Sequence, residues 1–159
     1  MSKSWQLFGG MSVVLLGIST IAVVCANAGA HVKAEDLPPG PIRERHELME
    51  SIGKHAKQIG DAVKRGEPQS VAADAEAISK KAQKISGLFP EGSTHEKSRA
   101  KVEIWAHWKD FEQGARNLAA DAAALARASK DGGDVKKASG KMFENCKSCH
   151  DSFRIPEKD

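Results

Sequence analysis

The amino-acid sequence predicts an all-α protein, an antiparallel up-down four-helix bundle. Three observations carry this prediction. Helix-forming alanine, lysine and glutamate are abundant, strand-like alternation is absent after residue 28, and apolar residues recur at steps of three and four in four stretches. Mostly short connections join these stretches, and short connections place consecutive helices side by side and antiparallel. The length of 159 residues suits one domain with an appendage.

The first 28 residues predict a secretory signal peptide that takes no part in the fold. Lys3 gives a positive start, an apolar run covers residues 7–24, and small residues follow at Ala26 and Ala28. This order is typical of a cleaved export signal. An uncleaved membrane anchor is the alternative, because the apolar run approaches the roughly 20 residues that span a bilayer. We therefore expect export to the periplasm, no membrane association after cleavage, and loss of Cys25 with the signal.

The folded domain is expected to cover residues 41–156. Residues 29–40 contain two prolines and no apolar period, so we expect a flexible lead-in there. Pro41 suits the first turn of a helix, and Gly66 with Pro68 ends it. The first helix therefore has about 24 residues. Its apolar stripe consists of Leu48, Met49, Ile52, Ala56, Ile59 and Val63.

Three further helices are predicted by the same spacing of apolar residues. They cover about 71–88, about 99–129, and 135 to near 156. Gly87 and Pro90 close the second helix, and the turn KDGGD closes the third. A longer loop around residues 89–98 separates the second helix from the third.

The sequence CKSCH near the C-terminus concentrates the chemistry of the chain. It contains the C-x-x-C-H pattern of haem attachment, formed by Cys146, Cys149 and His150. In this pattern two cysteine sulfurs bond the vinyl groups of the porphyrin, and the histidine coordinates the iron. Steps of three and four residues put all three side chains on one helix face, which is the apolar stripe of the fourth helix. The sequence therefore predicts one covalently attached haem c per chain, inside the bundle.

Other interpretations of the closely spaced cysteines fit less well. A thioredoxin-like redox pair needs a βαβ context that is absent. A zinc site needs a fourth ligand, and His95 and His107 lack paired zinc-ligand spacing. A bare dithiol would oxidise in an exported protein, and a disulfide across so short a loop would constrain little of the unfolded chain.

The best internal candidate for the sixth coordination position of the iron is Met49, on the inward stripe of the first helix. A thioether is a known axial ligand of haem iron, although a methionine on an apolar stripe more often packs a core. Met142 lies on the same helix as His150 and cannot reach the opposite haem face. Arg45 and Arg154 lie one turn from Met49 and His150. Each is a candidate for the haem environment, or alternatively a solvated arginine.

These residues together resemble class II cytochromes c, the cytochrome c′ family, which is itself a standard example of an up-down bundle. The resemblance covers about residues 42–154 and rests on four stretches. They are RHELMESIG, LFPEGS, EIWAHWKDFE and CKSCHDSFR. The position of the C-x-x-C-H motif belongs to the pattern, because class I cytochromes c carry it near the N-terminus.

The resemblance implies a role for six residues. Cys146 and Cys149 match the haem thioether positions, His150 the proximal iron ligand, Arg154 an arginine near the proximal face, Arg45 an arginine near the propionates, and Met49 the distal position. The family has a low-spin branch, in which a first-helix methionine is the sixth ligand and the protein transfers electrons. Its high-spin branch has five-coordinate iron that binds nitric oxide or carbon monoxide. A methionine at this position does not by itself distinguish the branches.

The sequence therefore predicts an exported one-electron carrier that docks with redox partner proteins. A haem protein that binds a small gas ligand is the alternative. No acid–base catalytic set is apparent, so we expect no enzyme. The 24 basic and 21 acidic residues are nearly balanced, whereas nucleic-acid binding requires a basic stripe. The resemblance also implies a homodimer through the first two helices.

Overall fold

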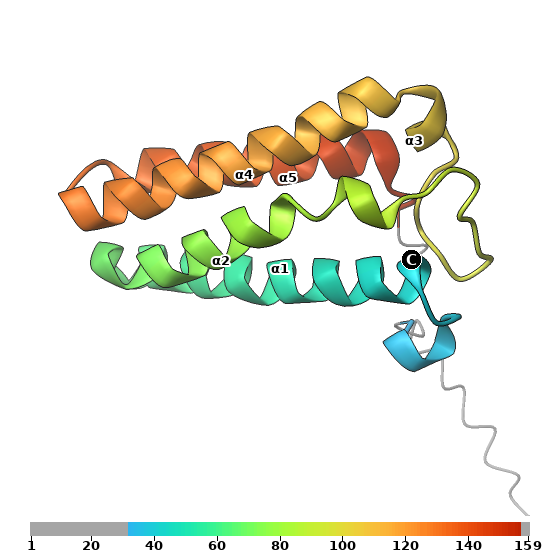
Figure 1. Ribbon diagram of the computed structural model, residues 1–159. Coiled ribbons are helices and arrows are strands. Elements are labelled where there is room, and N and C mark those ends of the chain that lie inside the picture. The colour runs from blue at the N-terminus through green and yellow to red at the C-terminus, as the bar shows by residue number, and fades with distance from the viewer. Residues whose placement is uncertain (1–31, 157–159) are drawn as a thin grey trace, which may run out of the picture.

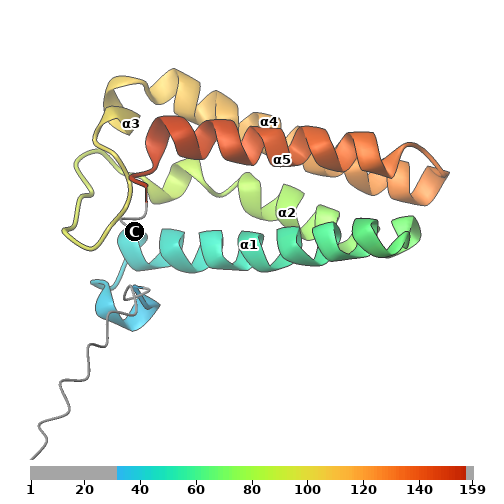
Figure 2. The ribbon, with the colours of Figure 1, turned by 180° about the vertical axis from the view of Figure 1, so that it is seen from behind.

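The computed structural model describes residues 32–156, and the signal peptide expected at residues 1–28 lies outside this part. Four main helices pack as two layers (Figure 1). One layer contains α1 (Pro41–Arg65) and α2 (Ala72–Ala82), and the other contains α4 (Trp108–Asp131) and α5 (Val135–Phe153). Consecutive main helices run in opposite directions along the bundle, as Figure 2 shows from behind. The predicted antiparallel up-down four-helix bundle is confirmed.

The predicted first helix forms with the expected bounds. Pro41 occupies its first turn, and Gly66 ends it in the left-handed conformation with φ 72°. Glycine adopts this conformation without the steric cost that a Cβ atom brings, so it is favoured after the last helical turn. The backbone N–H of Gly66 donates to the carbonyls of Ala62 and Val63, which the helix end would otherwise leave unpaired.

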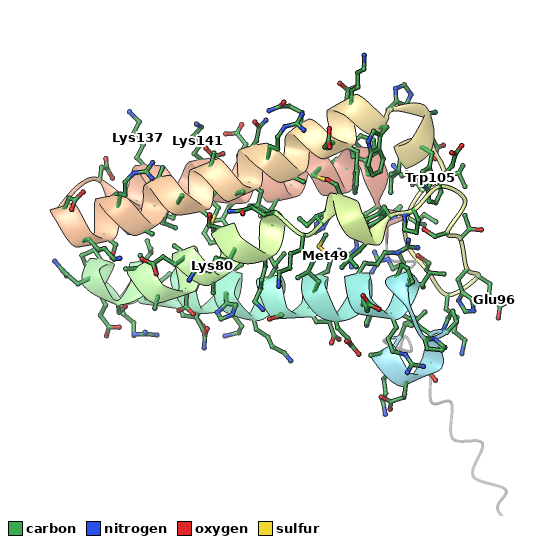
Figure 3. All side chains as sticks on the ribbon, in the orientation of Figure 1. Met49, Lys80, Glu96, Trp105, Lys137 and Lys141 are labelled. Carbon is green, nitrogen blue, oxygen red and sulfur yellow. The ribbon has the colours of Figure 1, made fainter. Side chains whose placement is uncertain are left out.

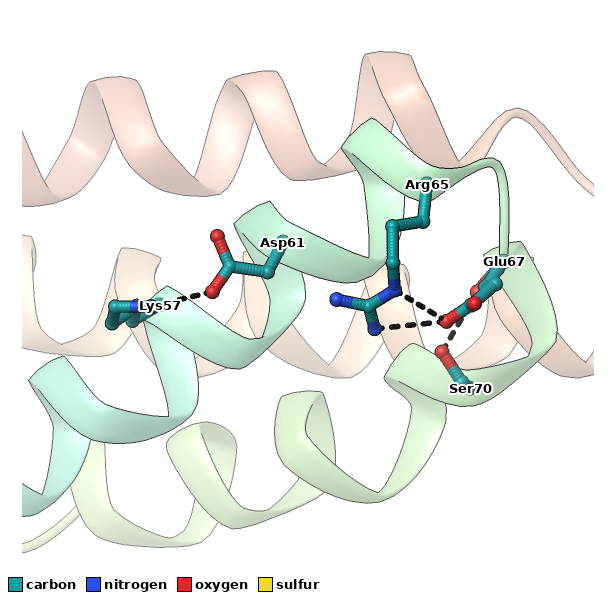
Figure 4. A network of polar contacts seen from close by, with 5 residues as sticks. All are labelled: Lys57, Asp61, Arg65, Glu67 and Ser70. Atoms are coloured by element: carbon teal, nitrogen blue, oxygen red, sulfur yellow. Dashed lines mark hydrogen bonds and ion pairs between the residues drawn. The ribbon is translucent and has the colours of Figure 1, made fainter.

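Ion pairs line the exposed side of this helix end (Figure 4). Lys57 pairs with Asp61 at 2.6 Å, one turn along α1. Arg65 pairs with Glu67 at 2.8 Å across the end of the helix, and Ser70 Oγ donates to the Glu67 carbonyl at 2.8 Å. The two contacts of Glu67 connect α1 to the single turn of 3-10 helix, η2 (Pro68–Val71), that precedes α2.

The second helix is shorter than the predicted 71–88. Regular α-helix ends at Ala82, and η3 (Ser86–Leu88) follows after a turn. Backbone N–H groups at residues 84, 85 and 88 bond to carbonyls three positions back, which is the tighter 3-10 pattern. This tightening directs Ile85 and Phe89, only 4% and 6% exposed, into the core. The apolar spacing that suggested one continuous helix is therefore retained, although the backbone changes from α-helix to 3-10 helix after Ala82.

The predicted third helix is interrupted. A short α3 (Glu103–Ala106) ends at His107, whose φ of −117° and ψ of 39° are not helical, and α4 starts at the next residue. The predicted start near residue 99 is wrong, because residues 99–101 run beside residues 153–155. Lys101 N–H donates to the Phe153 carbonyl at 3.0 Å, and Ile155 N–H donates to the Arg99 carbonyl at 2.7 Å.

The hydrophobic core lies between the two layers. Its fully buried large side chains come from all four main helices and the adjoining turns. They are Ile59, Val71, Ile78, Ile104, Leu125 and Met142. None of the helices in residues 32–156 is long and apolar enough to cross a membrane. In the segment expected to be a flexible lead-in, η1 (Ala34–Asp36) forms one turn, and Leu37 is 3% exposed.

Helices α1 and α5 diverge toward the end of the bundle at which α1 starts and α5 finishes (Figures 1 and 2). Packing is extensive between α4 and α5 and between α2 and α4, but sparse between α1 and α5. A Cβ atom at Gly60 of α1 would lie 3.8 Å from the Phe143 ring of α5, so these helices approach closely there. The motif of α5 lies beyond Phe143, on the side where α1 and α5 separate.

Candidate haem site

The cysteine motif occupies the last two turns of α5. Asp134 starts this helix, because its side chain accepts a hydrogen bond from Lys137 N–H at 2.9 Å and so caps the first turn. The buried residues Val135, Ser139 and Met142 define the face that α5 turns toward the core. Steps of three and four residues continue this face to Cys146 and Cys149.

Cys146 and Cys149 are both half-buried, and they do not form a disulfide with each other. Burial raises the pKa of each thiol, and the proximity of Cys146 raises that of Cys149 further. The pair therefore presents two protonated sulfurs, one helical turn apart, on one side of α5. This donor set fits the attachment of a porphyrin through its two vinyl groups.

His150 is exposed at the end of the same helix. Partial desolvation lowers its pKa, and the positive charges of Arg154 and Arg99 lower it further. These effects favour the neutral imidazole, which is the form that binds iron. Arg154 is exposed, its backbone N–H donates to the His150 carbonyl at 3.0 Å, and it forms an isolated β-bridge with Ala100. The structure thus places Arg154 beside His150.

Arg45 of α1 is buried, with 4% of its surface exposed. Its guanidinium donates to Ser93 Oγ at 2.8 Å, to the Ser93 carbonyl at 2.8 Å and to Ser98 Oγ at 3.0 Å. It also lies 4.6 Å from the centre of the Phe89 ring. The interpretation of Arg45 as a solvated arginine is therefore wrong.

This buried guanidinium has no carboxylate partner within residues 32–156. Burial lowers its pKa, because removing the charge from water is costly. Buried charges are normally paired with an opposite charge. Arg45 therefore fits an acidic group supplied from outside the chain, such as a haem propionate.

Met49 is half-buried and packs against the buried hydrophobic residues of the core. Figure 3 shows its side chain pointing from α1 toward the space between the layers. Because the start of α1 and the end of α5 lie at the same end of the bundle, Met49 of α1 and the cysteine motif of α5 also lie at this end (Figure 1). The structure thus gathers Arg45, Met49 and the motif at one end of the molecule, and these residues fit a c-type haem.

Sequence reasoning missed Ser93 and Ser98, which bind the Arg45 guanidinium. They lie 48 and 53 positions away from Arg45 in a loop without apolar periodicity. Because the contact depends on how the loop folds back over α1, no local pattern signals it. The stretch LFPEGS contributed to the family resemblance, but it gave Ser93 no individual role.

Comparison with known proteins agrees with a c-type haem site. The family described as Cytochrome C' matches residues 40–154. The cytochrome c' of Rhodopseudomonas palustris is 33% identical over 145 residues, which cover 87% of this chain and 96% of that protein. The cytochrome c-556 of Agrobacterium fabrum is 32% identical over 136 residues, which cover 82% of this chain and 88% of that protein.

Solved structures agree with these relatives. A cytochrome c' structure from Rhodopseudomonas palustris has a TM-score of 0.65 and 30% identity, and the match covers 76% of this chain and 100% of that one. A nitric-oxide-bound cytochrome c prime from Alcaligenes xylosoxidans has the same fold, with a TM-score of 0.65 at 20% identity over 80% of this chain and 99% of that one. The chain belongs to the cytochrome c′ family and is a c-type haem protein with covalently attached haem.

Proposed function

We propose that the protein is an exported one-electron carrier. Cys146 and Cys149 would hold the haem, and His150 and Met49 would be the protein ligands of its iron. The inward direction of Met49, at the same end of the bundle as the motif, carries this proposal (Figure 3). When bound, haem supplies a one-electron couple between ferrous and ferric iron.

The chain's own residues set the conditions for this chemistry. The two thioethers fix the cofactor to α5, and the charge of Arg154 favours the neutral form of His150. The buried guanidinium of Arg45 provides an uncompensated positive charge at the same end of the bundle. Met49 packs against the buried core, and this packing would restrict the approach of exogenous ligands to the iron.

We also propose the location, the domain limits, the non-enzymatic role and the oligomeric state of the protein. Residues 1–28 direct export to the periplasm, and residues 41–156 form the haem-binding domain, whose limits agree with the family match to residues 40–154. The protein is not an enzyme, because it exchanges single electrons with redox partner proteins and transforms no substrate. A homodimer forms through α1 and α2.

Substitution of Met49 tests the ligand assignment. The ferrous protein should show a low-spin absorption spectrum, and Met49→Ala should convert it to a high-spin spectrum that changes on addition of carbon monoxide. Met142→Leu is the matched control, because Met142 is buried on α5 and is not expected to reach the iron. A swap of similar volume in a core usually costs less than about 1.5 kcal/mol, so this variant should fold and stay low-spin.

Coincident spectra of the unmodified protein and Met49→Ala would refute ligation by Met49. If both are high-spin and both respond to carbon monoxide, the iron is five-coordinate. The alternative function, binding of nitric oxide or carbon monoxide, then replaces electron transfer. Magnetic circular dichroism of the ferric protein provides an independent readout, because a thioether ligand and a vacant position give different charge-transfer bands.

A further inference from the structure

An open cavity of about 550 Å³ lies between α5 and the α3–α4 segment. This volume is within the range of roughly 300–1,000 Å³ that is usual for ligand sites. No residue of α1 or α2 lines the cavity. Of the residues assigned to the haem, only Cys149 lines it, whereas Cys146, His150 and Met49 do not. The cavity therefore adjoins the haem site but is distinct from the space between the layers.

The lining of this cavity contains acidic residues and no lysine or arginine. Glu103, His107 and Asp110 follow one another at steps of four and three residues along one wall. Within residues 32–156, no hydrogen bond or ion pair engages their side chains. By contrast, Asp61 and Glu67 at the other end of the bundle have basic partners at 2.6 and 2.8 Å. The chain has a net charge of +3, but the lining of this cavity is locally acidic.

Gly114 opens the cavity toward the sulfur of Cys149. A Cβ atom at this glycine would lie 3.8 Å from Cys149 Sγ, so a larger side chain there would cover the sulfur. The neighbouring wall residues Asn117, Asn145 and Ser148 carry amide and hydroxyl groups. Such groups can both donate and accept hydrogen bonds, as recognition of a peptide chain requires.

We propose that this cavity receives a lysine or arginine side chain of the redox partner protein, seated by Glu103 and Asp110 next to Cys149. The inference rests on the proposed carrier function. Charge complementarity selects a cation, and the amide and hydroxyl groups of the walls suit the peptide segment that carries it. One electron then passes between the partner's redox group and the haem iron, so that one centre is oxidised as the other is reduced.

Binding can be tested with hexaamminechromium(III), a redox-inert paramagnetic trication. At low salt it should broaden the backbone amide signals of Gly114, Asn117 and Ser148 in the ¹⁵N-labelled ferrous protein. The double variant Glu103→Gln/Asp110→Asn should lose this broadening. A control with the same change in net charge, Glu96→Gln/Asp131→Asn, removes two exposed carboxylates outside the cavity and should retain it. Figure 3 shows Glu96 in the loop before α3.

Two results of the broadening experiment overturn the proposal. One is the absence of broadening at these amides, for instance because the porphyrin covers the cavity. The other is equal loss of broadening in the control, which would indicate a general charge effect. Competition then identifies the occupant, since N-acetylated trilysine amide and spermidine carry the same charge of about +3 at neutral pH. The proposal expects the peptide to compete at least as well as spermidine, and clear preference for spermidine would assign the cavity to a free polyamine.

Electron-transfer rates separate this inference from the carrier function. Oxidation of the ferrous haem by tris(phenanthroline)cobalt(III), which accepts one electron to give cobalt(II), should slow at least threefold in Glu103→Gln/Asp110→Asn relative to its control. The difference should disappear at high salt. Gly114→Leu should also slow this reaction, whereas Gly140→Leu, at an open helical position, should not. Equal rates in all variants overturn the docking site only, but a haem that exchanges electrons with neither this reagent nor ferricyanide overturns the carrier function itself.

Discussion

Replacement of Arg45 by methionine should loosen the loop that covers the start of α1. Methionine keeps most of the aliphatic volume and a contact with Phe89, but it loses three hydrogen bonds at 2.8, 2.8 and 3.0 Å. Hydrogen bonds to a charged group contribute about 1.5–3 kcal/mol each, or roughly 5–9 kcal/mol for three. The variant also avoids the cost of burying the guanidinium, which is several kcal/mol. We therefore expect a net loss of about 2 kcal/mol.

A loss of this size should lower the midpoint of thermal unfolding by about 8 °C, at about 4 °C per kcal/mol for a domain of this length. Amide hydrogen exchange should accelerate at Ser93 and Ser98, where the contacts are lost. The control is Arg43→Met on the same helix, since within residues 32–156 the Arg43 side chain donates only to the Leu37 carbonyl, outside the bundle. If Arg45→Met melts like the unmodified protein and its loop exchanges no faster, the assigned role of Arg45 is refuted.

Three further predictions concern attachment, capping and pH. Cys146→Ala or Cys149→Ala should each leave one thioether, visible as a longer-wavelength band of the reduced pyridine haemochrome, and the double variant should release haem to acidified acetone. Asp134→Ala should destabilise the protein by about 1 kcal/mol in urea unfolding, because it removes the cap of α5; a loss below about 0.3 kcal/mol would contradict this. The hydrogen bond and charge of Lys57 lower the pKa of Asp61 below its ordinary 3.8. The stability that ionised Asp61 gains from Lys57 is present above pH 3.8. It is lost as the pH falls through the lower pKa that Asp61 has in the folded protein. Lys57→Met should therefore weaken the acid dependence of unfolding between about pH 2 and 5, and an unchanged pH profile would show that the pair contributes nothing measurable.

The parts of the fold that depend on local sequence could be predicted. The bounds of α1 follow from Pro41 and Gly66, because both residues have conformational preferences that act without tertiary contacts. The start of α5 is likewise marked by Asp134, which caps it. The location of Cys146 and Cys149 on a half-buried helix face followed from their spacing within the apolar stripe.

The parts that depend on distant contacts could not be predicted. The apolar period runs from Ile104 through Trp108 to Phe111 without a break, although the backbone leaves the helix at His107. Residues 99–101 are extended because they bond with residues 153–155, and no local pattern reports on this pairing. The burial of Arg45 has the same origin, since its partners come from a remote loop. The acidic cavity beside Cys149 also forms only when α4 and α5 pack together.

The optical spectrum of the dithionite-reduced protein, recorded with and without carbon monoxide, tests the proposed carrier most directly. Coordination by both His150 and Met49 predicts a sharp low-spin α band that is unchanged by the gas, because the sixth position of the iron is filled. A broad high-spin spectrum that shifts when carbon monoxide is added would contradict this coordination. It would assign the protein to gas binding at an open iron position.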